Sequence, residues 1–205
     1  MLRGCPELKK LPADMGNLIN LRHLDMIDSN SIEEMPRGIG KLTSLQTLTN
    51  FIFIKGYGFR IKELGNLIHL VGKLFKSGIE NVVDPLYARG VCLNDKQGID
   101  VLTMVWSSES LDGLRNEMVT EVLDILQPHK KQKELHIRGY HGMSFPTWIG
   151  DRLFSKMVCM KLQNCKNCTS LPPLGQLPSL KDLHIEGMSA VKHVDGEFYG
   201  QHCAK

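Results

Sequence analysis

The chain has 205 residues, of which 42% are hydrophobic and 23% are charged, and its formal net charge at pH 7 is +3. This composition is typical of a globular protein and argues against a disordered tail; no window of roughly 18 apolar residues predicts a membrane-spanning helix. Because the lysines and arginines are scattered rather than gathered into a basic stripe, we do not expect the chain to bind nucleic acid.

The first residues, MLRGCPELKKLPADMG, contain no uninterrupted apolar segment that could form the core of a signal peptide. We therefore expect a cytoplasmic location. The six cysteines are too few and too irregularly spaced for a secreted disulfide scaffold. In a reducing compartment they are expected to be free thiols.

A repeated motif organises the sequence. The pattern G-x-L-x-x-L-x-x-L begins at Gly16, at Gly40 and again at Gly175, and the first two copies are offset by 24 residues. This offset lies within the roughly 20 to 29 residues of leucine-rich repeats, whose consensus contains L-x-x-L-x-L. The sets that fit this shorter pattern are Leu21, Leu24 and Met26; Ile99, Leu102 and Met104; Met157, Met160 and Leu162; and Leu180, Leu183 and Ile185.

The last two apolar positions of each set are two residues apart, which predicts a short strand with one buried face. The segment that follows returns the chain to the start of the next strand, so successive strands stack side by side. The predicted fold class is α/β. We expect a leucine-rich repeat solenoid, or horseshoe, with short parallel strands on the concave face and irregular or helical segments on the convex face.

The regularity of the motif divides the chain into three parts. We expect regular repeats over residues 1–54, irregular repeats over 55–133 and regular repeats again over 134–205. In the irregular part, Lys76 stands at a strand position that should be apolar.

The same irregular part contains a predicted helix. Apolar residues from Met118 to Leu126 recur at helical spacing, and Pro128 follows them. This spacing predicts an amphipathic helix over residues 116–127, packed on the outer face of the solenoid.

A C-x-x-C motif, Cys165 to Cys168, raises the question of a metal or redox site. Cys165 follows the last apolar strand position by three residues, where leucine-rich repeats carry Asn or Cys to satisfy backbone groups. Cys168 then falls in the position that Leu8 and Ile32 occupy earlier, which predicts a small buried hydrophobe. No second C-x-x-C or H-x-x-x-H pair offers further zinc ligands, and no helix N-terminus follows to lower the thiol pKa.

The motifs of known enzymes are also missing. The eight histidines form no metal-ligand pair at helical spacing, and no serine stands in a G-x-S-x-G turn. We predict no metal, no cofactor and no enzymatic activity. A thiol or metal enzyme that uses Cys165 and Cys168 is a less favoured alternative, which would require retained metal or an abnormally reactive thiol.

Several segments are more specific than the repeat. They are LPADMGNLINLRHLDM, ELGNLIHLVGKLFKSGIENV, EVLDILQPHKKQKELHIRGYHGMSFPTWIGD and NCKNCTSLPPLGQLPSLKDLHIEGM with VKHVDGEFYG after it. With them, nearly the whole chain resembles the leucine-rich repeat region of plant intracellular disease-resistance proteins of the coiled-coil nucleotide-binding leucine-rich repeat (NB-LRR) type. These repeats read L-P-x-x-x-G where plant cell-surface receptors usually read G-x-I-P, which agrees with a cytoplasmic location.

The resemblance implies a recognition module of a plant innate immune receptor. In such receptors this region contributes to sensing pathogen effectors or effector-modified host proteins, and it helps to restrain a nucleotide-binding switch domain. That domain and the coiled coil are absent from this chain, and Lys76 and Gln132 replace residues that the family pattern leads us to expect as apolar. We therefore expect a fragment; the alternative is a free-standing intracellular leucine-rich repeat scaffold or a truncated decoy.

The expected partners are proteins: a pathogen effector, a guarded host protein, or the nucleotide-binding domain of the same receptor. A solenoid presents the residues between and just after its strand leucines as a broad, rigid surface. The candidate contact residues on this concave surface are His23, Asp25, Thr47, Thr49, Glu134, His136, Arg138, Lys161, Asp182, His184 and Glu186.

Overall fold

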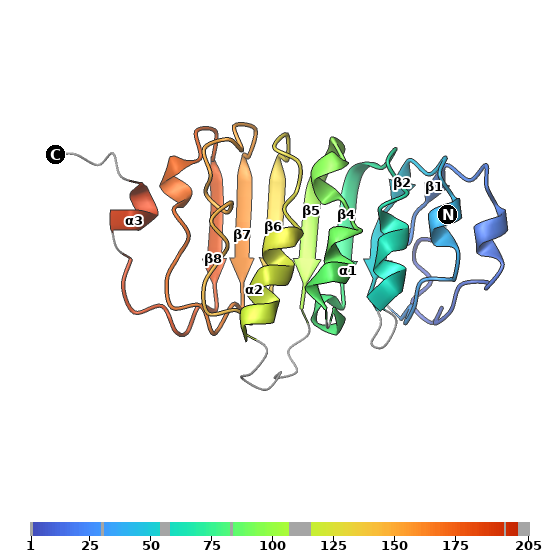
Figure 1. Ribbon diagram of the computed structural model, residues 1–205, viewed down its shortest axis with the longest axis horizontal. Helices are drawn as coiled ribbons and strands as arrows, with labels where there is room; N and C mark the ends of the chain where they lie inside the picture. The colour runs from blue at the N-terminus through green and yellow to red at the C-terminus, as the bar shows by residue number, and fades with distance from the viewer. Residues whose placement is uncertain are drawn as a thin grey trace.

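The computed structural model of the chain describes residues 2–29, 31–53, 58–82, 84–106, 116–194 and 196–200. Within these ranges, parallel strands follow one another in chain order along the molecule, and helices α1 (Pro85–Arg89) and α2 (Asn116–Ile125) lie over the same face of the sheet (Figure 1). The predicted leucine-rich repeat solenoid is confirmed.

The strands are short and pair only with their neighbours in sequence. Every strand pairing among the described residues is parallel, from β1 to β2 and from β3 through β8 in order. Their bounds are β1 His23–Leu24, β2 Thr47–Leu48, β3 Asn50–Ile52, β4 Val71–Ser77, β5 Gly98–Val105, β6 Glu134–Arg138, β7 Cys159–Gln163 and β8 Asp182–Glu186.

Parallel register brings equivalent apolar residues into buried rows. One row runs from Leu74 to Leu102, Leu135 and Met160, and each of these side chains is buried. Burying one such side chain contributes roughly 1.5–3 kcal/mol relative to leaving it in water. The row therefore ties neighbouring repeats together, as a solenoid requires.

The spacing of the strands explains why part of the sequence looks irregular. Leu24 and Leu48 pair across 24 positions, whereas Leu102 and Leu135 pair across 33. The longer connection contains α2, whose bounds fall within the 116–127 span that the helical spacing predicts. Strand pairing thus continues through the irregular part, where longer segments join the strands.

Helix α2 packs onto the core through its apolar side. Val122 and Leu123 are buried, and so is Leu126 directly after the helix. On the neighbouring segment, the Tyr140 hydroxyl donates a hydrogen bond to the Ser144 carbonyl (2.9 Å) and lies 3.0 Å from Thr120 Oγ1. These contacts hold the helix against the repeat that follows it.

Left-handed residues mark the exit from several strands. Gly139, Gly187 and Asn164 directly follow β6, β8 and β7, with φ angles of 70°, 68° and 55°. A Cβ atom at Gly139 would lie 2.5 Å from the Trp106 carbonyl oxygen. Glycine is therefore required at that position by both the backbone conformation and the close approach of the preceding repeat.

Lys76 and Gln132 are both buried, although the pattern predicts apolar residues at their positions. Gln132 Nε2 donates hydrogen bonds to the carbonyl oxygens of Asp100 (2.8 Å) and Glu134 (2.9 Å). Lys76 Nζ has no hydrogen-bond partner among the described residues and lies 5.8 Å from the centre of the Phe53 ring. Burial lowers the pKa of Lys76 well below its usual value of 10.5, because the charged amine loses its hydration.

The convex connections contain mainly short 3-10 turns. No helix in the described part of the chain is long and apolar enough to cross a membrane. The turns are Met15–Asn17, Ile39–Lys41, Gly58–Leu64, Ile79–Asn81, Leu93–Asp95 and Leu174–Gln176, and a short helix, α3, spans Gly196–Tyr199.

The C-x-x-C cysteines lie in the core. Cys165 and Cys168 are fully buried free thiols, as the repeat alignment predicts. The Cys168 thiol donates to the Gly142 carbonyl at 3.1 Å, and the Cys165 thiol donates to the Gln163 carbonyl at 3.5 Å. Burial raises the pKa of Cys165 to about 11 and raises that of Cys168 as well, so both stay protonated and poorly nucleophilic.

Candidate protein-binding surface

The concave face is the surface of the sheet that points away from α1 and α2. Every second side chain of a strand lies on this face, and parallel pairing aligns it with its equivalents in neighbouring strands. His136, Lys161 and His184 are in register across β6, β7 and β8. The flanking rows are Glu134, Cys159 and Asp182 on one side, and Arg138, Gln163 and Glu186 on the other. The structure therefore brings the seven candidate residues of these three strands together in one surface.

Hydrogen bonds organise the row next to the strand exits. Gln163 Nε2 donates to Glu186 Oε2 at 3.2 Å, and His184 Nε2 lies 3.2 Å from the same oxygen. The hydrogen bond with His184, followed by that from Gln163, lowers the pKa of Glu186. The exposed carboxylate therefore stays ionised and held in position, which suits it to pair with a cationic group of a partner.

The N-terminal candidates differ from one another in accessibility. His23 is exposed, and its Nδ1 lies 3.0 Å from Thr47 Oγ1 on the neighbouring strand. Thr49 is only 8% exposed, and its hydroxyl accepts a hydrogen bond from the Met26 N–H at 2.8 Å. Asp25 Oδ1 accepts from the Ile27 N–H at 3.0 Å. The expectation that Thr49 is an exposed contact is corrected: its hydroxyl satisfies a buried backbone group.

A pocket of about 280 Å³ opens on the same face, where the β2–β3 segment meets β4 and β5. Phe75 is 37% exposed at its wall, although it belongs to a strand of the core sheet. The repeat motif does not reveal this pocket, because β4 lies in the irregular part of the sequence. The alternation of side chains in VGKLFKS is the signal that could have found it. The pocket is lined by Ile27, Asp28, Thr49, Asn50, Lys73, Leu74, Phe75, Val101 and Thr103.

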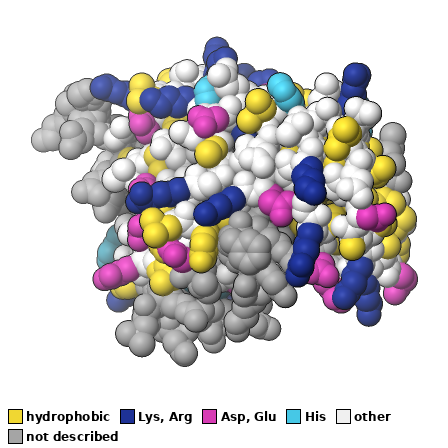
Figure 2. All heavy atoms as spheres, turned by 45° about the vertical axis from the view of Figure 1, so that its right-hand side comes forward, with side chains coloured by type: hydrophobic (Ala, Val, Ile, Leu, Met, Phe, Trp, Pro, Cys, Tyr) yellow, Lys and Arg dark blue, Asp and Glu magenta, His cyan; other side chains and the backbone are white. Residues whose placement is uncertain are grey.

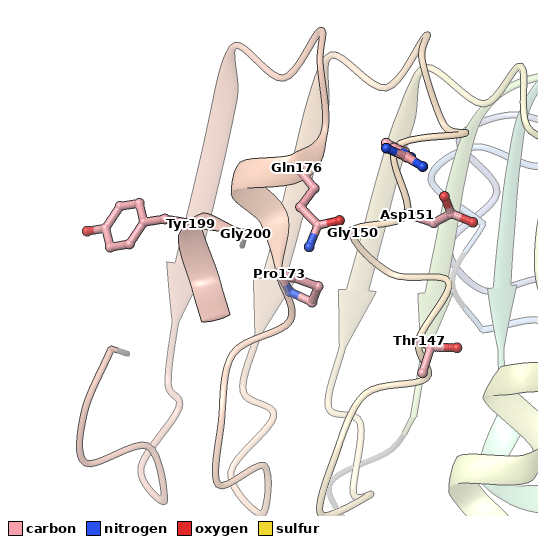
Figure 3. A pocket seen from close by; sticks show the side chains of 8 residues that line it. Thr147, Gly150, Asp151, Pro173, Gln176, Tyr199 and Gly200 are labelled. Atoms are coloured by element: carbon pink, nitrogen blue, oxygen red, sulfur yellow. The ribbon is translucent and has the colours of Figure 1, made fainter. Parts of the chain in front are cut away.

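A second hollow, of about 550 Å³, lies near the C-terminal end (Figure 3). Gln176 and Asp151 lie on different segments around it, and the Tyr199 ring points away from both. Asp151 Oδ1 already accepts a hydrogen bond from the Leu153 N–H at 2.9 Å. This arrangement holds no pair of an acid and a base in mutual contact that would indicate catalysis. Its other lining residues are Thr147, Gly150, Arg152, Pro173 and Gly200.

Charged side chains of both signs are interspersed with hydrophobic ones on the face drawn in Figure 2. The lysines and arginines seen there do not merge into a single stripe. This distribution agrees with the scattered charges of the sequence and suits mixed contacts with a protein better than binding to a phosphate backbone.

One cluster on the concave face was not foreseen from the sequence. Glu134, His136 and Cys159 each offer a ligand atom, and these atoms all lie within 4.8 Å of one another. Burial lowers the pKa of His136, and the nearby Lys161 lowers it further. No sequence motif indicates the cluster, because parallel pairing, rather than a short spacing in sequence, brings Cys159 beside Glu134.

The chain matches a known family of leucine-rich repeats and several known proteins. The family described as R13L1/DRL21 LRRs matches residues 61–188. The chain is also 43% identical over 157 residues to RPP13-like protein 1 of Arabidopsis thaliana, an alignment that covers 74% of this chain and 15% of that protein. It is 34% identical over 195 residues to RGA4 of Solanum bulbocastanum, over 95% of this chain and 19% of the relative.

Both relatives are named as disease resistance proteins, and the chain spans less than a fifth of the length of either. Among solved structures, the functional domain of InlJ from Listeria monocytogenes aligns with 88% of this chain and 42% of that one, with a TM-score of 0.46 and 13% identity.

Proposed function

We infer the function of this chain from its family: it belongs to the R13L1/DRL21 leucine-rich repeats, and the relatives that it matches are plant disease resistance proteins. We propose that it is the recognition module of a plant innate immune receptor. In this role the chain performs no catalysis and binds protein partners through the concave face.

The observation that carries this proposal is the alignment of three polar rows over β6, β7 and β8. These rows present acidic, basic and imidazole side chains at fixed spacing on the solvent-facing side of the sheet. Because strand pairing fixes the backbone that carries them, a partner can bind without ordering that backbone, and the pattern of charges can discriminate between partners.

The proposed partners are a pathogen effector, a host protein that the effector modifies, and a nucleotide-binding switch domain of the receptor. Contact with the switch domain would hold it inactive until an effector competes for the module. A cytoplasmic location is part of the same proposal, because the switch domain and the intracellular effector are encountered there.

Co-precipitation tests the proposed contact with the switch. The chain and the nucleotide-binding segment of a coiled-coil NB-LRR receptor would be expressed as separate tagged polypeptides in leaf tissue. We expect the chain to capture the segment, and an unrelated leucine-rich repeat protein of similar length to serve as the negative control. Capture no better than this control would contradict a role in restraining the switch.

The size of the native protein separates this role from that of a free-standing scaffold or decoy. An antibody raised against residues 51–78 would be used to probe native tissue by immunoblot. A band far above 23.1 kDa is expected for a receptor module, whereas a band only near 23.1 kDa would favour the free-standing alternative.

A further inference from the structure

Three potential metal ligands converge on the concave face. The carboxylate of Glu134 and the imidazole of His136 extend from β6, and the thiol of Cys159 extends from β7, where Glu134 and Cys159 are paired in register. Their ligand atoms lie within 4.8 Å of one another, and Glu134 Oε2 is 3.8 Å from His136 Nε2. Asp182 follows in the same row on β8.

The histidine has an unused coordinating atom. His136 Nε2 is buried and has no hydrogen-bond partner among the described residues, while Nδ1 lies 3.4 Å from Thr103 Oγ1. A buried ring nitrogen without a partner is costly. A bound cation would satisfy it. Metal-bound histidine usually donates its other ring N–H to an oxygen acceptor, and the Thr103 hydroxyl oxygen can accept from Nδ1 here.

We propose that Glu134, His136 and Cys159 form a site for a divalent transition-metal ion of the zinc type. Nitrogen, thiolate and carboxylate donors together match the preference of Zn²⁺, whereas Ca²⁺ and Mg²⁺ prefer oxygen donors alone. A tetrahedral zinc ion holds its donors roughly 3 to 4 Å apart, so small side-chain rotations from the present positions suffice.

Some charges near the site oppose the binding of a cation and others favour it. Lys161 lies in register with His136, and Lys73 lies in the same row as Glu134 and Cys159, with Val101 between them. The charges of these two lysines oppose the approach of a cation. The carboxylate of Glu134 and the thiolate that Cys159 forms on coordination offset them, as the thiol proton is released to solvent.

The site has two structural consequences. Metal bound there would cross-link β6 to β7 on the side of the sheet away from the core, and it would keep a fourth coordination position open toward the concave groove. A histidine, cysteine or carboxylate of a partner could complete the coordination sphere. Metal binding by the chain itself does not depend on the proposed immune role, so either proposal can fail without the other.

Cobalt(II) tests the site because it substitutes for zinc and absorbs light when a thiolate is bound. The full chain would carry serine at Cys5, Cys92 and Cys203, which leaves Cys159 and the two buried core cysteines. We expect one equivalent of Co²⁺ to produce a thiolate-to-cobalt charge-transfer band, and one equivalent of Zn²⁺ to abolish it.

Two ligand variants and one control make the result specific. In Cys159→Ser the band should disappear, and in His136→Gln the affinity for Co²⁺ should fall at least about tenfold. His184→Gln removes an exposed histidine from the neighbouring strand and should leave affinity within about twofold. Circular dichroism would verify that each variant is folded, and Glu134→Gln, whose side chain is partly exposed, replaces any variant that is not.

The contradicting results are equally definite. The chain with serine at Cys5, Cys92 and Cys203 and no further substitution would overturn the proposal if it showed no charge-transfer band with stoichiometric Co²⁺. So would a band that survives in Cys159→Ser, since the metal would then be bound by Cys165 and Cys168.

Discussion

Strands β4 and β7 belong to the same parallel sheet, yet they fill one buried row with opposite chemistry. The register aligns Lys76 of β4 with Met104, then Ile137, and finally Leu162 of β7. Leu162 is apolar and fully buried, whereas Lys76 is fully buried with an amine that has no hydrogen-bond partner among the described residues. The two equivalent positions therefore differ in the free energy that they contribute to folding, because burying the Leu162 side chain is favourable and burying the Lys76 amine is costly.

The difference between β4 and β7 shows that strand register is a stronger constraint than the preference of one side chain for water. Both neighbours of β4 hold it in register through backbone hydrogen bonds and through the adjacent buried leucine, Leu74. A single unfavourable side chain does not shift the strand, because a shift by one residue would expose Leu74 and turn Lys73 toward the core in its place. Lys76 is thus a local loss of stability within a register that the rest of the strand determines.

The largest effect should come from copying the β4 chemistry into β7. Leu162→Lys removes a buried leucine and introduces an amine that has no partner there, and should cost about 4 kcal/mol of unfolding free energy. Urea denaturation followed by circular dichroism would measure it. Gln163→Lys, on the concave side of the same strand, is the control and should change stability by less than about 0.5 kcal/mol.

The reverse change should stabilise the protein. Lys76→Met keeps the length of the side chain and removes the buried amine, and we expect a gain of about 2 kcal/mol in the same denaturation experiment. A loss of stability would mean that the amine has a favourable partner, and it would remove the basis of the comparison.

A smaller effect should follow from Gln132, which is buried but hydrogen-bonded. Gln132→Leu removes the bonds to the Asp100 and Glu134 carbonyl oxygens, and we expect it to cost about 1 kcal/mol despite the gain in apolar surface. If Lys76→Met raises the unfolding free energy and Gln132→Leu lowers it, hydrogen bonding rather than polarity determines whether a buried polar side chain destabilises the protein. Stabilisation by both substitutions would contradict this.

The subtlest effect is on the dependence of stability on pH. The folded state lowers the pKa of Lys76, so between that lowered value and the usual 10.5 the unfolded chain binds more protons than the folded one. The unfolding free energy contributed by Lys76 should therefore rise as pH rises through this window. Comparing the unfolding free energies of wild type and Lys76→Met at about pH 7 and about pH 9 isolates the contribution of Lys76, because the buried Lys96 is present in both proteins. An unchanged difference between the two proteins would show that Lys76 does not titrate in this range.

The sequence predicts the parts of the fold that rest on local periodicity. The L-x-x-L-x-L sets locate the apolar residues of β1, β7 and β8, and the repeat alignment identifies Cys165 and Cys168 as buried. Each of these features depends on spacings of only a few residues. Such spacings are fixed by the geometry of a strand and its exit turn, so they can be recognised without knowledge of the tertiary contacts.

The features that the sequence does not predict depend on which strands are neighbours and in what register. Cys159 meets Glu134 across a connection of 25 positions, and Phe75 lines a pocket together with residues of β3 and β5. Thr49 has a polar side chain that suggests an exposed position, but the Met26 N–H of the preceding repeat occupies its hydroxyl. Contacts of this kind join residues of neighbouring strands whose separation in sequence varies from repeat to repeat, so no motif of fixed spacing predicts them.

The central claim, recognition through the concave face, is tested most directly by the affinity of the chain for the nucleotide-binding segment in two matched variants. The concave variant changes the charges of β6 and β8 through Arg138→Glu, His184→Glu and Glu186→Lys. The control variant makes the same kinds of change at exposed residues outside the concave face, through Lys156→Glu, Asn66→Glu and Glu121→Lys.

We predict that the concave variant binds at least about tenfold more weakly than wild type, a loss of about 1.4 kcal/mol, and that the control stays within about twofold. Equal affinities of the wild type and the concave variant would contradict the account, and they would place the recognition surface elsewhere on the solenoid.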